Sequence, residues 1–135
     1  MASIFDKLIA NELPCHVVFE DKHTLAFLDI APVAEGHTLV IHKTDRSAEL
    51  SSMRPQAAAQ LMQTAQRVIT LLKSKLGAQG VNMLLAEGGV AGQEVMHAHI
   101  HVIPRYADDG LKLHNVGAKK ASEESLAALA KNLYS

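Results

Sequence analysis

The stretch HAHIHVIPR, at residues 97–105, constrains the fold of this 135-residue chain more than any other segment. Polar and apolar residues alternate in it without error over six positions, beginning at His97. Successive side chains of a β-strand point to opposite faces of the sheet, so the pattern predicts a strand over residues 96–103. One face of that strand would carry three imidazoles, and the other face would carry apolar side chains that belong to the core.

The rest of the chain predicts an α+β fold. Apolar runs bounded by turn residues predict strands, and apolar residues that recur every three or four positions predict helices. A run of strands interrupted by one long helix is typical of a mostly antiparallel sheet, here five-stranded, packed on that helix. The fourth strand is almost wholly apolar, and we expect it to be buried on both faces. The predicted elements are a helix at residues 4–10, strands at 16–20, 24–28 and 37–43, the long helix at 55–76, strands at 81–86 and 96–103, and a helix at 122–133.

Composition excludes several classes of function. The net charge is -1 with no basic stripe, so we expect no nucleic-acid partner. No segment approaches the roughly 20 apolar residues of a membrane span, so we expect no membrane partner. The single cysteine, Cys15, cannot form an internal disulfide, which favours a reducing compartment. We therefore expect a cytoplasmic location, with the nucleus as an additional one.

The row of imidazoles has three interpretations. A half-exposed strand would carry the histidines on its wet face, although three at every second position are rarely met by chance. Zinc binds histidine, with His37 or His114 as further ligands, but the outer imidazoles of a straight strand start roughly 13 Å apart. In the third interpretation, one imidazole attacks phosphorus and a neighbour protonates the leaving group.

A glycine-rich loop at residues 88–93, GGVAGQ, strengthens the third interpretation. Glycines let backbone N–H groups turn towards phosphate oxygens, so such a loop can cradle an anion. Alone it is weak evidence, because flexible connections have the same composition. Directly before a row of histidines it indicates a phosphate site.

These residues resemble a known family. AGQEVMHAHIHVIPR is similar to the signature of the histidine triad (HIT) hydrolases, three histidines alternating with apolar residues after Gly-Gln-x-Val. The similarity continues upstream through IFDKLIANELP and VVFEDKHTLAFLDIAPVAEGHTLVI, and covers roughly residues 4–105. The start and the compact length resemble the Hint-like branch, the purine nucleoside phosphoramidases and protein kinase C inhibitor-like proteins, more than the diadenosine polyphosphate hydrolases of the Fhit branch.

The resemblance implies a role for each matched residue. His99 would be the nucleophile that becomes nucleotidylated, and His101 would assist the leaving group. His97 and His37 would belong to the supporting network, and Asp29 would accept hydrogen bonds from ribose hydroxyls. The purine pocket would be walled by Ile4, Phe5, Leu8, Phe27 and Ile30, and the α-phosphate would be held by Gly92, Gln93 and the backbone N–H groups near Glu94 and Val95.

The family match also implies an architecture and an activity. It implies one HIT domain over residues 1–135, with a core at about 4–105 and a C-terminal tail and helix at 106–135. Two copies would form a homodimer with a ten-stranded sheet, joined through the long helix and a central strand. The implied activity is that of an adenosine 5'-monophosphoramidase, which cleaves the P–N bond of AMP-amine conjugates without a metal or cofactor. The alternatives are a diadenosine polyphosphate (Ap3A/Ap4A-type) hydrolase and a purine-nucleotide-binding scaffold with incidental turnover.

Four positions depart from the family pattern. Some relatives carry Cys-x-x-Cys at the positions of Ser3 and Asp6, with histidines completing a zinc site, so we expect no structural zinc here. Ala86 stands where the family often has an asparagine that helps to hold the phosphate. His42 is not a family ligand, and we expect it at the surface.

Overall fold

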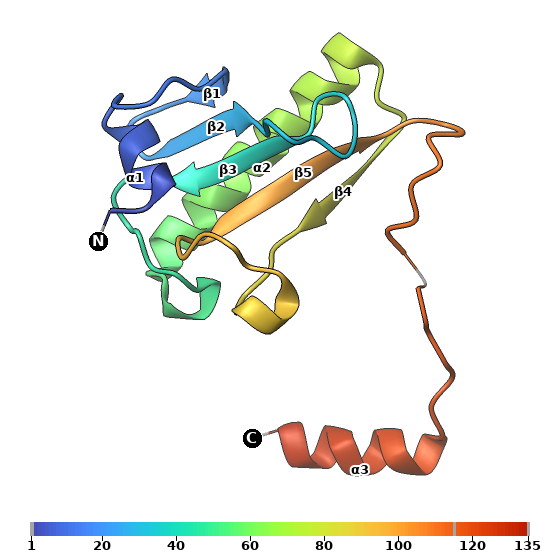
Figure 1. Ribbon diagram of the computed structural model, residues 1–135. Coiled ribbons are helices and arrows are strands. Elements are labelled where there is room, and N and C mark those ends of the chain that lie inside the picture. The colour runs from blue at the N-terminus through green and yellow to red at the C-terminus, as the bar shows by residue number, and fades with distance from the viewer. Residues whose placement is uncertain (1, 115, 135) are drawn as a thin grey trace.

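The computed structural model describes residues 2–114 and 116–134 of the chain (Figure 1). Its elements follow the order predicted from the sequence, and most of their ends lie within one or two residues of the predicted ones. They are α1 (Ile4–Ile9), β1 (Val17–Glu20), β2 (Thr24–Leu28), β3 (Thr38–His42), a 3₁₀ helix (Leu50–Ser52), α2 (Pro55–Leu76), β4 (Gly80–Leu84), a 3₁₀ helix (Gly89–Ala91), β5 (His99–Arg105) and α3 (Glu123–Leu133).

The five strands form one sheet in the order β1-β2-β3-β5-β4, which confirms the predicted α+β class. Every neighbouring pair is antiparallel. The long helix α2 lies across one face of this sheet, and the short helix α1 lies on the opposite side (Figure 1). Pro55 begins α2, and Gly77 ends it in the left-handed conformation that favours glycine at this position.

The two faces of the sheet bury different clusters. Against α2, the side chains of Ala26, Val40, Ile100 and Val102 pack on a helical stripe that includes Leu61 and Val68. Against α1, a smaller cluster joins two helix residues, Phe5 and Leu8, to residues of β2 and β3. Those strand residues are Leu25, Phe27, Leu39 and Ile41.

The strand that carries the histidines begins later than predicted. β5 starts at His99, so His97 and Ala98 precede it. It also continues beyond its predicted end at residue 103, and Pro104 lies opposite Val81 of β4. On the other edge, pairing with β3 ends at Val102. Pro104 therefore lies beyond the region in which β5 pairs with β3. Its missing N–H costs no hydrogen bond between these two strands.

The prediction that the fourth strand is buried on both faces is wrong for the single chain. β4 is the edge strand of the sheet, and Met83 and Leu84 are exposed at its end. An apolar run indicates that a segment can be buried, but it does not indicate whether the cover comes from the same chain.

Gly36 makes the tight entry into β3. Its φ is +97°, and a Cβ atom placed on it would lie 2.6 Å from Cδ1 of Leu76. Any other residue would collide with the end of α2 and would be strained in this backbone conformation. Because His37 follows directly, this turn sets where the His37 ring enters the site.

The C-terminal segment differs from the sheet domain. Arg105 anchors its start, donating to both carboxylate oxygens of Asp109 and to Oδ1 of Asn82 at 2.7 Å. Beyond it, the described residues of α3 are all exposed, and the helix lies away from the sheet (Figure 1). Among the helices that the structure describes, none has the length and apolar character needed to span a membrane.

Candidate active site

The imidazoles of the predicted site gather on the face of the sheet that α2 does not cover. The ring centroids of His99 and His101 lie 5.0 Å apart, and those of His101 and His37 lie 5.2 Å apart. Phe5 of α1 packs edge-on against this group, with its ring centroid 5.1 Å from His99 and 5.6 Å from His97. The helix α1 is thus the cover of the histidine row.

The hydrogen bond of His99 defines which ring nitrogen is free. Its Nδ1 lies 2.8 Å from the backbone carbonyl oxygen of His97. A carbonyl oxygen only accepts, so Nδ1 carries the proton, and the lone pair of the neutral ring is on Nε2. His99 therefore presents Nε2 as a nucleophile whose tautomer is set by the backbone immediately before the strand.

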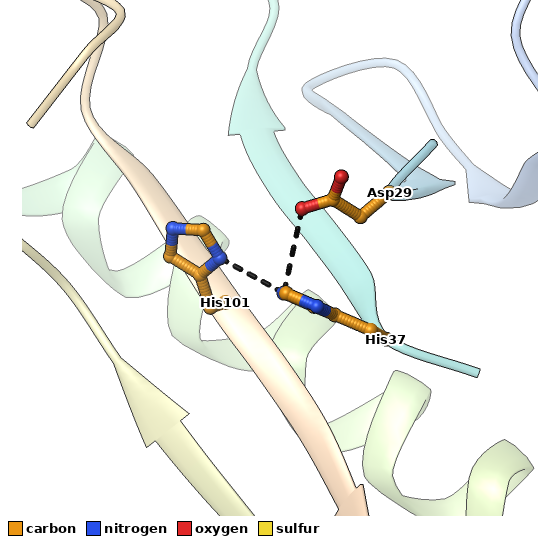
Figure 2. Close-up of side chains that lie close together, drawn as sticks. All are labelled: Asp29, His37 and His101. Atoms are coloured by element: carbon orange, nitrogen blue, oxygen red, sulfur yellow. Dashed lines mark hydrogen bonds and ion pairs between the residues drawn. The ribbon is translucent and has the colours of Figure 1, made fainter. Parts of the chain in front are cut away.

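A second chain of hydrogen bonds runs through His37 and His101 (Figure 2). The backbone N–H of Val33 donates to Nδ1 of His37 at 3.2 Å, so the proton of the neutral His37 ring is on Nε2. This Nε2 lies 2.9 Å from Nδ1 of His101 and donates to it. The proton of His101 must then lie on its own Nε2, which makes that atom a proton donor.

Burial keeps both of these rings neutral. It lowers the pKa of His37, although the Asp29 carboxylate 3.6 Å from Nε2 acts in the opposite direction. Burial, together with the charges that His99 and His37 can carry, lowers the pKa of His101 to about 4. At neutral pH both rings are therefore uncharged and keep the tautomers that the hydrogen bonds require.

Asp29, His37 and His101 are also close enough together to suggest a metal site, with their ligand atoms within 4.8 Å of one another (Figure 2). A metal would need a lone pair on Nε2 of His37, with the proton moved to Nδ1. Nδ1 would then face the Val33 N–H, donor against donor. The cluster fits a hydrogen-bond chain better than a metal ion.

His97 and His42 are both buried, and the prediction that His42 lies at the surface is wrong. As the last residue of β3, His42 points towards α2, and its Nε2 lies 2.8 Å from Oε1 of Gln60. The loop after β3 turns back onto the same ring, because the Asp45 N–H donates to Nδ1 at 2.9 Å. His97 donates from Nε2 to the carbonyl oxygen of His42 at 3.0 Å, so its side chain ties the residues before β5 to the end of β3.

The glycine-rich loop is held in place by Gln93, whose side chain is buried. Its Oε1 accepts from the Gly88 N–H at 2.8 Å, and its Nε2 donates to the carbonyl oxygens of Ala48 and Val95. The predicted phosphate contact of this side chain would require these bonds to break, so the structure gives Gln93 the role of shaping the loop. The Gly92 N–H likewise closes a turn onto Gly89.

The backbone N–H groups of Glu94 and Val95 donate to no group in the part of the chain that the structure describes. They come directly after the braced loop and before the histidine row. They are therefore the free donors that the predicted phosphate site needs. Glu94 itself is exposed, and Val95 packs against the α1 cluster.

The predicted walls of the purine pocket fall into two groups. Phe5, Leu8 and Phe27 are buried and form a floor, whereas Ile4 is half exposed and Ile30 is 92% exposed. An isoleucine with this exposure gains free energy if a flat apolar ligand covers it. Asp29 has one carboxylate oxygen 3.6 Å from Nε2 of His37, and its Oδ1 accepts from the Ala31 N–H at 2.9 Å.

The zinc site of some relatives does not fit this chain. Ser3 and Asp6, at the cysteine positions, form a capping box in which each side chain accepts from the backbone N–H of the other. Both side chains are thereby committed to α1, and neither is a thiolate. The structure therefore supports no step through a metal at this position.

The site is thus a row of imidazoles, tilted against one another, beside a loop with free backbone N–H donors. Residues 10–108 match the HIT domain model. The chain therefore belongs to the HIT family, whose members are nucleotide hydrolases.

Individual proteins show the same relation. The chain is 45% identical over 107 residues to an uncharacterized HIT-like protein of Methanocaldococcus jannaschii, covering 79% of this chain and 81% of that one. It is 34% identical over 105 residues to an adenosine 5'-monophosphoramidase of Schizosaccharomyces pombe, covering 78% and 75%. A zinc-bound histidine triad family protein of Mycobacterium smegmatis has a similar structure, with a TM-score of 0.79, 32% identity, and coverage of 98% of this chain and 96% of that one.

Proposed function

We propose that the chain is an adenosine 5'-monophosphoramidase that cleaves the P–N bond of AMP-amine conjugates. The observation that carries the proposal is the pair of opposite tautomers. His99 holds a lone pair on Nε2, and His101 holds a proton on Nε2. A nucleophile and a proton donor therefore stand side by side, 5.0 Å between ring centroids, as P–N cleavage requires.

In the first half of the reaction, Nε2 of His99 attacks phosphorus, and a bond from phosphorus to His99 replaces the bond to the amine. The electron pair of the broken bond goes to the amine nitrogen, which takes the proton from Nε2 of His101. The His101 ring is left with a negative charge, which balances the positive charge on His99 until water returns the proton. The His99 ring becomes positively charged in the intermediate, and its Nδ1–H continues to donate to the His97 carbonyl oxygen. Because that bond strengthens as charge develops, it stabilises the nucleotidylated enzyme.

In the second half, water attacks the same phosphorus and gives its proton to Nε2 of His101. The bond to His99 breaks, AMP is released, and both rings return to their starting tautomers. The Val33–His37 chain supports this cycle, since it holds Nδ1 of His101 as an acceptor throughout.

The preference for an amine over a nucleotide as leaving group has a second support. An amine becomes a good leaving group only when it is protonated, and the neutral His101 supplies that proton. The described loop beside the site bears Glu87 and Glu94 and no lysine or arginine from residue 86 to 98. This composition favours a neutral or cationic leaving group over a polyphosphate.

A homodimer is part of the proposal. β4 has an unpaired outer edge, with Met83 and Leu84 exposed beside it. Exposed apolar edge strands pair readily with another chain, and a second copy on this edge would extend five strands to ten.

The proposed function is tested by incubating the protein with an AMP-amine conjugate and with diadenosine tetraphosphate. We expect AMP release from the conjugate to be the faster reaction. We expect His99→Ala to lower it by at least about a thousandfold, as loss of a covalent nucleophile does. Rapid quench should trap wild-type protein with one added AMP on His99. Equal slow release by wild type and variant would refute the proposal, and faster cleavage of the dinucleotide would favour the alternative hydrolase.

A further inference from the structure

The cover of the histidine row is a helix that cannot hold itself in place. α1 has six residues, well below the length at which a helix is stable alone in water. Its capping box satisfies the backbone N–H groups of Ser3 and Asp6, but it does not fix the helix to the sheet. The contacts that attach α1 to the rest of the molecule therefore determine how well the Phe5 ring stays packed against His99.

Asp6 supplies a tie of this kind. Its Oδ2 accepts from the Ser3 N–H at 2.7 Å, and its Oδ1 accepts from Nη1 of Arg46 at 2.9 Å. The Ser3 hydrogen bond and the Arg46 charge lower the pKa of Asp6, so the carboxylate is ionised at neutral pH. One side chain thus caps the helix and reaches the loop after β3.

Arg46 comes from a rigid part of that loop. Its Nε donates to the Lys43 carbonyl oxygen at 3.0 Å, which fixes the direction of the guanidinium. The loop is itself wrapped around the buried His42 ring through the Asp45 N–H. Two hydrogen bonds from Ser47 and one from Arg54 hold the pKa of Asp45 down to about 2, so this anchor is also charged.

The same loop supports the nucleophile from the other side. The His42 carbonyl oxygen accepts from His97, and the His97 carbonyl oxygen accepts from His99. Phe5 connects α1 to this group of contacts, because its ring packs against both His97 and His99. The Arg46–Asp6 pair therefore joins the two sides that meet at the His99 ring, the loop behind it and the helix in front of it.

We propose that Arg46 is a positioning residue for the nucleophile: through Asp6 it holds α1, and so Phe5, against His99. The catalytic consequence rests on the proposed role of His99, but the attachment of α1 does not.

The central experiment replaces Arg46 by glutamine, which removes the charge and keeps the length. Two measurements need no substrate: hydrogen exchange of the α1 amides, and carbethoxylation of His99 by diethyl pyrocarbonate, located by peptide mass spectrometry. We expect both to rise about two- to fivefold, the range that a partly exposed ion pair supports. The kcat/KM for the AMP-amine conjugate should fall by a similar factor.

Three controls make the result specific. Arg46→Lys keeps the charge, and we expect values close to wild type. Arg54→Gln removes a neighbouring ion pair with Asp45 that does not touch α1, and we expect unchanged α1 exchange. In the double variant Asp6→Asn/Arg46→Gln, the effects should be smaller than the sum of the two single ones, because both remove the same pair.

The proposal is overturned if Arg46→Gln leaves α1 exchange and His99 modification at wild-type values, or if Arg54→Gln raises them equally. It is also overturned if EDTA raises α1 exchange in the wild type, since a metal would then hold the helix. If the substrate-free readouts change as expected and no AMP-amine conjugate is cleaved, the attachment of α1 stands and the proposed reaction fails.

Discussion

The two faces of the sheet are built from the same strands but are covered very differently. On one face, the 22-residue helix α2 spans the strands and buries a continuous apolar cluster. On the other face, six residues of α1 cover the histidines and a smaller cluster. Alternation along β5 assigns Ile100 and Val102 to the first face and His99 and His101 to the second. The larger apolar cluster thus lies on one face, and the imidazoles are buried on the other.

The largest expected effect is a loss of stability from a substitution on the α2 face alone. Leu61 is fully buried at the centre of the α2 stripe, and Leu61→Ala should lower the free energy of unfolding by about 4 kcal/mol, through lost burial and a cavity. We expect kcat/KM of the folded protein to change little, because Leu61 does not contact the histidine face. Chemical denaturation and kinetics below the unfolding transition measure the two. A large loss of activity without a loss of stability would mean that the faces are coupled.

The next largest effect is the loss of stability at low pH that the buried histidines cause. Burial lowers the pKa of His101 from 6.5 to about 4, and it also lowers the pKa of His37 and His97. Between pH 6.5 and pH 4, the unfolded chain binds a proton at His101 that the folded chain does not bind. The free energy of unfolding is therefore highest above pH 6.5 and decreases as the pH falls towards 4. His101 alone should account for a decrease on the order of 3 kcal/mol.

Urea unfolding at half-unit pH steps from 7 to 4 measures this decrease. His101→Gln serves as the control, because its profile should be shallower than that of the wild type. Identical profiles for the two proteins would show that the acid sensitivity arises elsewhere.

The smallest expected effect on stability comes from the same leucine-to-alanine change on the opposite face of the sheet. Leu8→Ala, in α1, should cost about 2 kcal/mol, at the lower end of the range, because a short surface helix can settle into the space. Unlike Leu61→Ala, it should lower kcat/KM by about tenfold, since displacement of α1 moves Phe5 away from His99. If the two truncations had equal effects on stability and on rate, the division of labour between the faces would be wrong.

The sequence predicted most elements because their signals are local. Alternation, a proline at the start of α2 and a glycine at its end depend on the backbone alone, and the structure places α2 at Pro55–Leu76, as predicted. The histidine signature likewise predicted which side chains gather, because a strand fixes their spacing. Both kinds of signal are carried by residues that are neighbours in the sequence.

The errors concern what each residue meets across the fold. His42 ends a strand with a polar residue, which resembles a surface position, but Gln60 of α2 satisfies its ring within the core. The phosphate contact of Gln93 stays a prediction, and the three hydrogen bonds of its side chain, which hold the loop, were likewise not foreseen. Nothing in the sequence indicated the roles of the Val33 N–H and the Arg46 side chain. A backbone amide is present at every position except proline, and a lone arginine is most often solvated.

β5 carries the histidines of the candidate site and the apolar side chains of the core on alternate sides of one strand, and this limits how the gene can change. Insertion or deletion of a single codon between His97 and Ile103 would exchange the two sides, turning imidazoles towards α2 and apolar side chains towards the nucleotide. Both halves of the molecule would fail in one mutational step. This strand can therefore diverge only by substitution, whereas the exposed residues 116–121 before α3 can change in number without such a penalty.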